Sequence, residues 1–179
     1  MRRAAAALPT AVLLAACGSE TSNAPAPTPT PTPSPTSFVT AYAGSWTGMW
    51  SDAAAGTSGA VFFIVTPTSL STVDVAVTLG GNVLGGTAPA NPVTFSGMID
   101  QQGMHFTAPM ADVLGDCTAT VQTGGGAVTA HCSNVPLTTV SSFDVTGTWT
   151  GGAAHLTYTV TFKMGQPPAT GTATLTRSQ

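Results

Sequence analysis

The chain has 179 residues, of which 6% are charged and 42% are hydrophobic, and its formal net charge is −3. It contains only four lysine and arginine residues, so it lacks the basic surface that binding to nucleic acid or anionic lipid requires. Gly, Thr, Ala and Val take the place of the Glu, Lys and Leu that are common in helical proteins, which indicates an all-β fold.

The N-terminal segment has the features of an export signal. Two arginines precede a short apolar run that ends in small residues, which is the pattern that secretion requires. The run closes with Leu14, Ala15, Ala16 and Cys17, a sequence that resembles the lipobox of bacterial lipoproteins. An ordinary secretory signal with a chance cysteine is the alternative.

The lipobox resemblance implies that residues 1–16 are removed as a signal peptide. It also implies a diacylglyceryl group on Cys17 and, usually, palmitate or another acyl chain on the new amino terminus. One acyl chain holds a protein weakly at a membrane, whereas several hold it firmly. Gly18 stands where an aspartate favours retention in the inner membrane of some diderm bacteria. We therefore expect a lipid-anchored protein of the cell envelope, on the outer membrane if the host has one and otherwise on the outer face of the cell membrane.

Residues 17–37 are predicted to be a lipidated N-terminus and a linker rich in proline and threonine. From 24 to 36, every second residue is proline, which lacks an amide hydrogen and holds the residue before it extended. This tract is predicted to be a semi-rigid stalk that spans ~40 Å at ~3.1 Å per residue. Its threonines and serines are also candidates for glycosylation, with an unmodified tether as the alternative.

Residues 38–179 are predicted to form one β-domain. Apolar and polar residues alternate with a period of two, for example around Val73, Val75 and Val77, which is typical of half-buried strands. Short gaps between strands indicate antiparallel hairpins, and a long meander tends to close and so remove its edges. We expect an up-and-down barrel of about 8–10 strands, with a β-sandwich as the alternative. The candidate strands lie near 41–50, 59–66, 71–79, 82–88, 93–99, 104–110, 117–123, 126–132, 143–150, 155–164 and 170–177.

Two hairpins have registers that can be read from the sequence. Pairing Ile99 with Met104 places the apolar residues of both strands on one face. A glycine turn in a later hairpin places Cys117 directly opposite Cys132, where Cα atoms ~4.5–5.5 Å apart suit a disulfide. Export also favours a disulfide. Metal binding through His131, next to Cys132, is the alternative, but these side chains point to opposite faces and no second ligand pair is visible.

The start of the first candidate strand carries a family-like motif. Gly44, Ser45 and Trp46 resemble the Gly-x-Trp motif of the calycins, which include lipocalins, fatty-acid-binding proteins and avidins. The resemblance implies a barrel that an arginine or lysine of the last strand closes by packing over the tryptophan. Arg177 matches that residue, and a cation over an indole contributes ~0.5–2 kcal/mol. Two alternatives stay open. Arg177 is a solvated terminal charge, or the family-like motif is the second Gly-x-Trp sequence, which ends at Trp149.

No pattern in the sequence indicates catalysis. The chain has no paired carboxylates, no Gly-x-Ser-x-Gly elbow and no His-Glu metal motif. His105, His131 and His155 fall on the polar faces of three different candidate strands, as surface residues do. We therefore expect a protein that is not an enzyme and that has neither a cofactor nor a metal site.

Two functions are compatible with such a barrel. The first is a structural or interaction module of the envelope with a filled core, and it is the one we favour from the sequence. The alternative is a binding protein for a small apolar ligand in the barrel interior, because barrels of this size either fill their core or hold one small ligand. The oligomeric state stays open. The candidate ligand-lining residues are Trp50, Phe95, Ile99, Phe106, Trp149, Tyr158 and Phe162.

Overall fold

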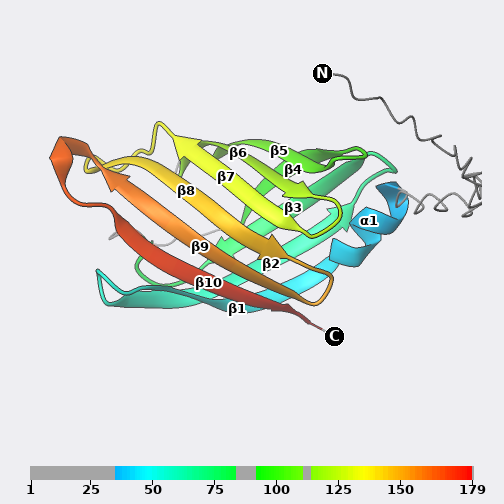
Figure 1. Cartoon of the computed structure of the whole chain (residues 1–179), viewed down its shortest axis with the longest axis horizontal. Coiled ribbons are helices and arrows are strands. Elements are labelled where there is room, and N and C mark those ends of the chain that lie inside the picture. Colours follow the sequence, from blue (N-terminus) through cyan, green and yellow to red (C-terminus); the bar gives the residue numbers. More distant parts are fainter. Residues whose placement is uncertain (1–34, 84–91, 111–113, 179) are drawn as a thin grey trace, which may run out of the picture. The chain divides into compact units, whose positions relative to one another are not determined.

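The computed structural model describes residues 35–83, 92–110 and 114–178. Within these ranges the chain forms an α-helix, ten strands and a short 3-10 helix (Figure 1). The helices span Pro35–Tyr42 (α1) and Lys163–Gly165 (η2). The strands span Gly44–Asp52 (β1), Thr57–Pro67 (β2), Thr72–Leu79 (β3), Val93–Ile99 (β4), Gly103–Met110 (β5), Gly115–Gln122 (β6), Ala127–Ser133 (β7), Val140–Trp149 (β8), Ala153–Phe162 (β9) and Ala169–Arg177 (β10).

The strands form one closed antiparallel barrel. Each strand pairs with its neighbours in the chain, and β1 also pairs with β10. This closing pair runs from Trp46 opposite Arg177 to Asp52 opposite Gly171. Closure pairs the backbone groups of both terminal strands and leaves no sheet edge exposed. The predicted up-and-down barrel is confirmed, the β-sandwich alternative is excluded, and the strand number lies at the upper end of the expected range.

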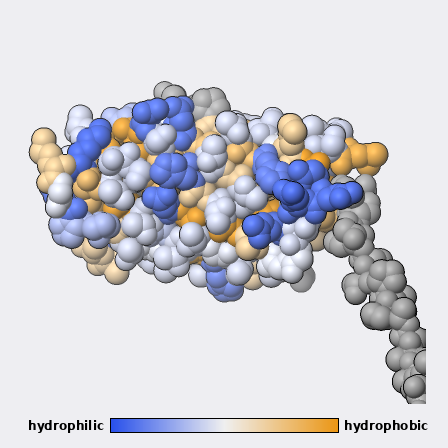
Figure 2. Space-filling view, turned by 45° about the horizontal axis from the view of Figure 1, so that its top comes forward, coloured by the Kyte–Doolittle hydropathy of each residue, from blue (hydrophilic) through white to orange (hydrophobic). Residues whose placement is uncertain are grey.

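The outer face of the barrel is rich in threonine instead of charged residues. On strands β6 to β10, five threonines lie opposite one another in a continuous row: Thr120, Thr129, Thr146, Thr157 and Thr172. Threonine is β-branched, so it favours an extended backbone, and its hydroxyl is hydrated without a charge. Much of the face in Figure 2 is accordingly pale, which marks intermediate hydropathy. Threonine hydroxyls thus give the outer surface of the barrel polar contact with water, although few of its residues are charged.

Most expected strands lie within a few residues of the observed ones, and three places show a difference in the type of structure. The first strand begins at Gly44, because residues 41 and 42 belong to helix α1. The candidate strand at 82–88 lies mostly outside the described residues, and Asn82 and Val83 are not in a strand. Strand β9 ends at Phe162, before η2. Met164, in the expected continuation of that strand, has a left-handed backbone (φ 65°) and is 99% exposed.

Both predicted hairpin registers are confirmed. Ile99 pairs with Met104 between β4 and β5. Cys117 pairs with Cys132 between β6 and β7, and the two residues form a disulfide. Both cysteines are buried inside the barrel, so the crosslink lies on its inner wall.

Helix α1 covers one end of the barrel (Figure 1). It begins at Pro35, inside the tract that the sequence predicts to be extended, because proline suits the first helical position, where no amide hydrogen bond is needed. Phe38, Val39 and Tyr42 are buried. The Tyr42 ring meets the Trp149 ring edge-on at a centroid distance of 5.4 Å. The helix therefore closes this end with apolar side chains.

Candidate functional site

The interior of the barrel contains an apolar cavity of about 230 Å³. Side chains from all ten strands line it, so the cavity exists only in the closed sheet. No charged side chain is among the described residues that line it. The aromatic lining consists of Trp50, Phe63, Phe95, Phe106, Phe143, Trp149 and Tyr158. The aliphatic lining includes Val61, Val75, Val77, Leu79, Val121, Val128, Val145 and Leu156.

Small residues on the inner face leave this space open. Ala119 pairs with Ala130 across β6 and β7, and both line the cavity. Their methyl groups do not reach the barrel axis as a leucine or phenylalanine would. Gly97 has a different effect, because a Cβ there would overlap the ring of Phe106. The missing side chain at Gly97 thus leaves room for an aromatic ring, whereas the small side chains of Ala119 and Ala130 leave part of the cavity unfilled.

Most polar atoms of the lining are bonded to the backbone. The Trp50 Nε1–H donates to the Gly80 carbonyl at 2.8 Å, and the Tyr158 hydroxyl donates to the Ser51 carbonyl at 3.0 Å. Burial, together with the nearby Asp52 carboxylate, raises the pKa of Tyr158 to about 12. Tyr158 is therefore uncharged at neutral pH, and the cavity wall that it forms is apolar.

The structure places the Arg177 side chain differently from the prediction that it packs over a tryptophan. Arg177 lies opposite Trp46 on paired strands. Its guanidinium donates to the carbonyls of Ala41, at 3.4 Å, and of Ala43. The Trp46 indole is fully buried and donates to the Tyr42 carbonyl at 2.8 Å. Among the described residues, the polar contacts of Arg177 are with these carbonyls and not with the face of an indole.

The reason is the position of helix α1. The last carbonyls of a helix have no partner within it and carry the negative end of its dipole, so a cation bonds there favourably. Gly44 follows the helix with φ +113°, a conformation that suits glycine, and it lets the chain turn from α1 into β1. The Gly-x-Trp motif therefore supplies the turn after α1 and the indole that packs beneath the helix end.

Five of the seven predicted lining residues line the cavity: Trp50, Phe95, Phe106, Trp149 and Tyr158. Ile99 is buried in the core outside the cavity lining, and Phe162 is half-buried at the end of β9. The prediction omitted Phe63 and Phe143, which do line the cavity. Their alternation with Val61 and Val145 was a signal that could have identified both residues, because it places them on the inner face.

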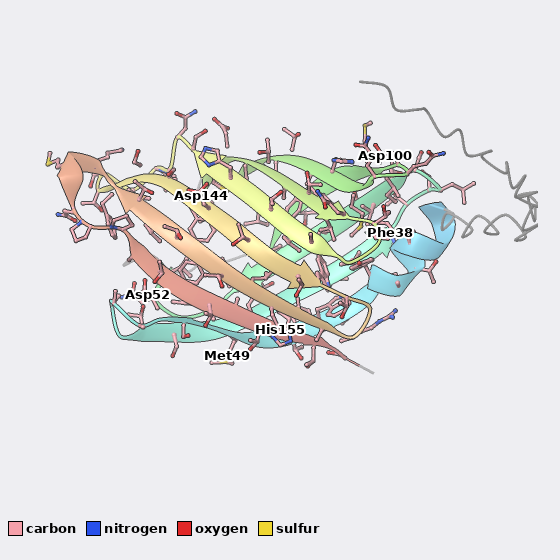
Figure 3. The ribbon with its side chains drawn as sticks, in the orientation of Figure 1. Phe38, Met49, Asp52, Asp100, Asp144 and His155 are labelled. Carbon is pink, nitrogen blue, oxygen red and sulfur yellow. A yellow bond between two sulfur atoms is a disulfide. The ribbon has the colours of Figure 1, made fainter. Side chains whose placement is uncertain are left out.

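The histidines lie outside the cavity. His131 Nδ1 is 2.6 Å from Asp144 Oδ1, and His105 Nε2 is 3.2 Å from Asp100 Oδ1. Figure 3 labels Asp144 and His155 on strands of the barrel and Asp100 in the β4–β5 turn, and all three are at least partly exposed. Backbone amide hydrogen bonds, first from Gln102, lower the pKa of Asp100.

The part of the chain that the structure describes has neither a metal site nor a membrane-spanning helix. No cluster of three or more histidine, cysteine, aspartate or glutamate side chains could hold a metal ion there. Neither described helix has the length and apolar character needed to span a membrane.

No protein-family model matches the chain, and no curated protein matches it in sequence. Among solved structures it is similar to Rv2717c from M. tuberculosis, with 13% identity, a TM-score of 0.55, and coverage of 81% of this chain and 98% of that chain. It is also similar to the S-type phycobiliprotein lyase CPES from Guillardia theta, with 10% identity, a TM-score of 0.50, and coverage of 80% and 92%. At these identities the similarities show the fold alone. Together with the strand order, that fold fits a calycin-like barrel.

Proposed function

We propose that this protein is a non-catalytic, lipid-anchored binding protein of the bacterial envelope that holds a small apolar ligand inside its barrel. The observation that carries the proposal is the cavity of about 230 Å³ with an apolar lining. The sequence favoured a filled core, and the hollow interior favours the ligand-binding alternative instead.

The volume limits the size of the ligand. An apolar cavity of about 150 Å³ stays dry and takes up benzene, whereas pockets for drug-sized ligands start at about 300 Å³. The cavity lies between these sizes. We expect a compact ligand of about one or two rings, or a branched chain of similar volume.

The lining determines the polarity of the ligand. Neither Lys163 nor Arg177, the two described residues with fixed positive charge, lines the cavity. A carboxylate inside would therefore lose its hydration without gaining a partner. Transfer of apolar surface out of water yields about 25 cal/mol per Å², so a neutral apolar molecule gains from entry.

The anchoring part of the proposal rests on the lipobox resemblance at Cys17 and on the proline-rich tract that follows. A lipid at Cys17 would place the barrel on a stalk at the membrane surface. A tethered barrel of this kind would hold an apolar molecule close to the membrane from which such molecules partition.

Binding of naphthalene, measured by equilibrium dialysis, tests the cavity. Ala130→Leu fills the interior and should weaken naphthalene binding at least tenfold. Ala127→Leu makes the same change on the exposed face of the same strand and should leave binding unchanged. Wild-type protein that does not bind naphthalene, or equal binding by both variants, would show that the cavity is not the binding site.

A further inference from the structure

Trp149 is exceptional among the buried polar residues. Within the described part of the chain, its Nε1 is the one buried side-chain nitrogen or oxygen that has no hydrogen-bond partner. The other two tryptophans donate to backbone carbonyls, Trp46 to Tyr42 and Trp50 to Gly80. A buried donor without a partner destabilises a protein, so an unpaired indole N–H needs an explanation.

The position of Trp149 suggests one. It lies at the end of β8, is 5% exposed and lines the cavity. Its ring contacts the rings of Trp46, Tyr42 and Phe63 at centroid distances of 5.3, 5.4 and 5.9 Å. These rings hold the indole at the end of the cavity that helix α1 covers.

We propose that the ligand of this cavity carries one neutral hydrogen-bond acceptor, such as a ketone, aldehyde or ether oxygen, which accepts the N–H of Trp149. This inference rests on the proposed function and names the class of ligand. The polar atoms of Trp50 and Tyr158 are already bonded to the backbone, so the lining offers this donor and no cation. One donor suits one neutral oxygen, whereas a carboxylate would leave its charge unmatched.

The bond requires a small movement of the protein. In the structure Nε1 is covered by its neighbours, so a ligand oxygen can reach it only if the indole rotates slightly. Side-chain adjustments of this kind are common on binding. The competing explanation is that the N–H points at the face of a neighbouring ring, a weak interaction that would be independent of the ligand.

Two ligands of the same shape separate these explanations. 2-Acetylnaphthalene and 2-isopropenylnaphthalene differ in having C=O or C=CH₂ at the same position. Their affinities are measured by equilibrium dialysis on the purified full chain, for the wild type and for Trp149→Phe. We expect the ratio of ketone to alkene affinity to fall about fivefold in Trp149→Phe, the loss expected for one hydrogen bond.

Trp50→Phe is the matched control, because Trp50 also lines the cavity but donates to Gly80. It should lower both affinities and leave their ratio unchanged. An unchanged ratio in Trp149→Phe would overturn the inference while leaving the proposed function intact. Failure of the wild type to bind either naphthalene would instead overturn the proposed function.

A second measurement serves if Trp149→Phe does not fold. In the wild-type protein labelled with ¹⁵N, the Trp149 indole N–H resonance should move downfield with the ketone and not with the alkene. Equal shifts with both ligands would show that the N–H bonds to no ligand oxygen.

Discussion

At the scale of single residues, Arg177 of the last strand, β10, contacts the helix that precedes the first strand, β1. Its guanidinium donates to the carbonyls of Ala41 and Ala43, the latter 134 residues away in sequence. These carbonyls lie at the negative end of helix α1, so charge and hydrogen bonding act together. The side chain therefore holds the helix against the barrel end that it covers.

Replacing Arg177 tests this contact. Arg177→Ala should lower the free energy of unfolding by about 1 kcal/mol, because two charge-assisted hydrogen bonds at an exposed site are lost. Lys163→Ala, a change at an exposed position of η2, should have an effect below about 0.5 kcal/mol. Urea unfolding of both variants gives the comparison, and equal values for the two would contradict the role of Arg177.

Tyr158 should make stability depend on pH. Its pKa is about 12 in the folded protein, against 10.0 as the ordinary value. The unfolded chain therefore loses this proton first, so the stabilisation is complete below pH 10 and is lost as the pH rises towards 12. Urea unfolding at a series of pH values should show this decline, with a shallower slope in Tyr158→Phe. An unchanged slope in that variant would place the cause elsewhere.

At the scale of elements, alternation decides where strands form, but it does not decide where they begin. Residues 41 and 42 are helical because Tyr42, Phe38 and Val39 bury their side chains at the barrel end. That apolar spacing has a helical period, and packing against the barrel stabilises it. The strand begins at Gly44, where a positive φ ends the turn from the helix.

The hairpin of β6 and β7 is expected to depend on its disulfide. Cys117 and Cys132 are 15 residues apart, and a loop of this length is stabilised by about 3 kcal/mol in the chain-entropy model. Replacing both by alanine should lower the free energy of unfolding by up to about that amount. Mass spectrometry without reducing agent should show the linked peptides, and free thiols at both positions in envelope-purified protein would contradict the crosslink.

At the scale of the whole molecule, closure of the sheet creates the cavity and the helix covers one of its ends. Figure 3 shows Phe38 at the helix end of the barrel and Asp52 at the other. Asp52 is buried, and its Oδ1 accepts the amides of Ala54 and Ala55 in the β1–β2 turn. Among the described residues, a helix and apolar rings thus cover one end of the barrel, and the other end carries the β1–β2 turn.

The proposed membrane attachment of the whole protein should depend on one residue. Cys17→Ala removes the proposed acyl site, so the protein should leave the membrane fraction. Cys117→Ala, the same change in the barrel, should leave the protein in that fraction. Fractionation with a carbonate wash measures the difference, and a Cys17→Ala protein that stays bound would refute the lipoprotein proposal.

The sequence by itself determined which residues face inward and how the hairpins pair. Alternation between neighbours is a local property, so the registers of Ile99 with Met104 and of Cys117 with Cys132 could be read from it. The turn lengths also indicated a closed meander. Five of the seven predicted lining residues were found for the same reason.

Only the tertiary structure decided what fills the interior. The direction in which a side chain points does not give its distance to side chains on the far wall, which depends on strand tilt and barrel radius. For that reason Ala119 and Ala130 could have belonged to a tight taper, and they border a void instead. The partners of Arg177 and the unpaired N–H of Trp149 also depend on packing between distant segments, which no local pattern records.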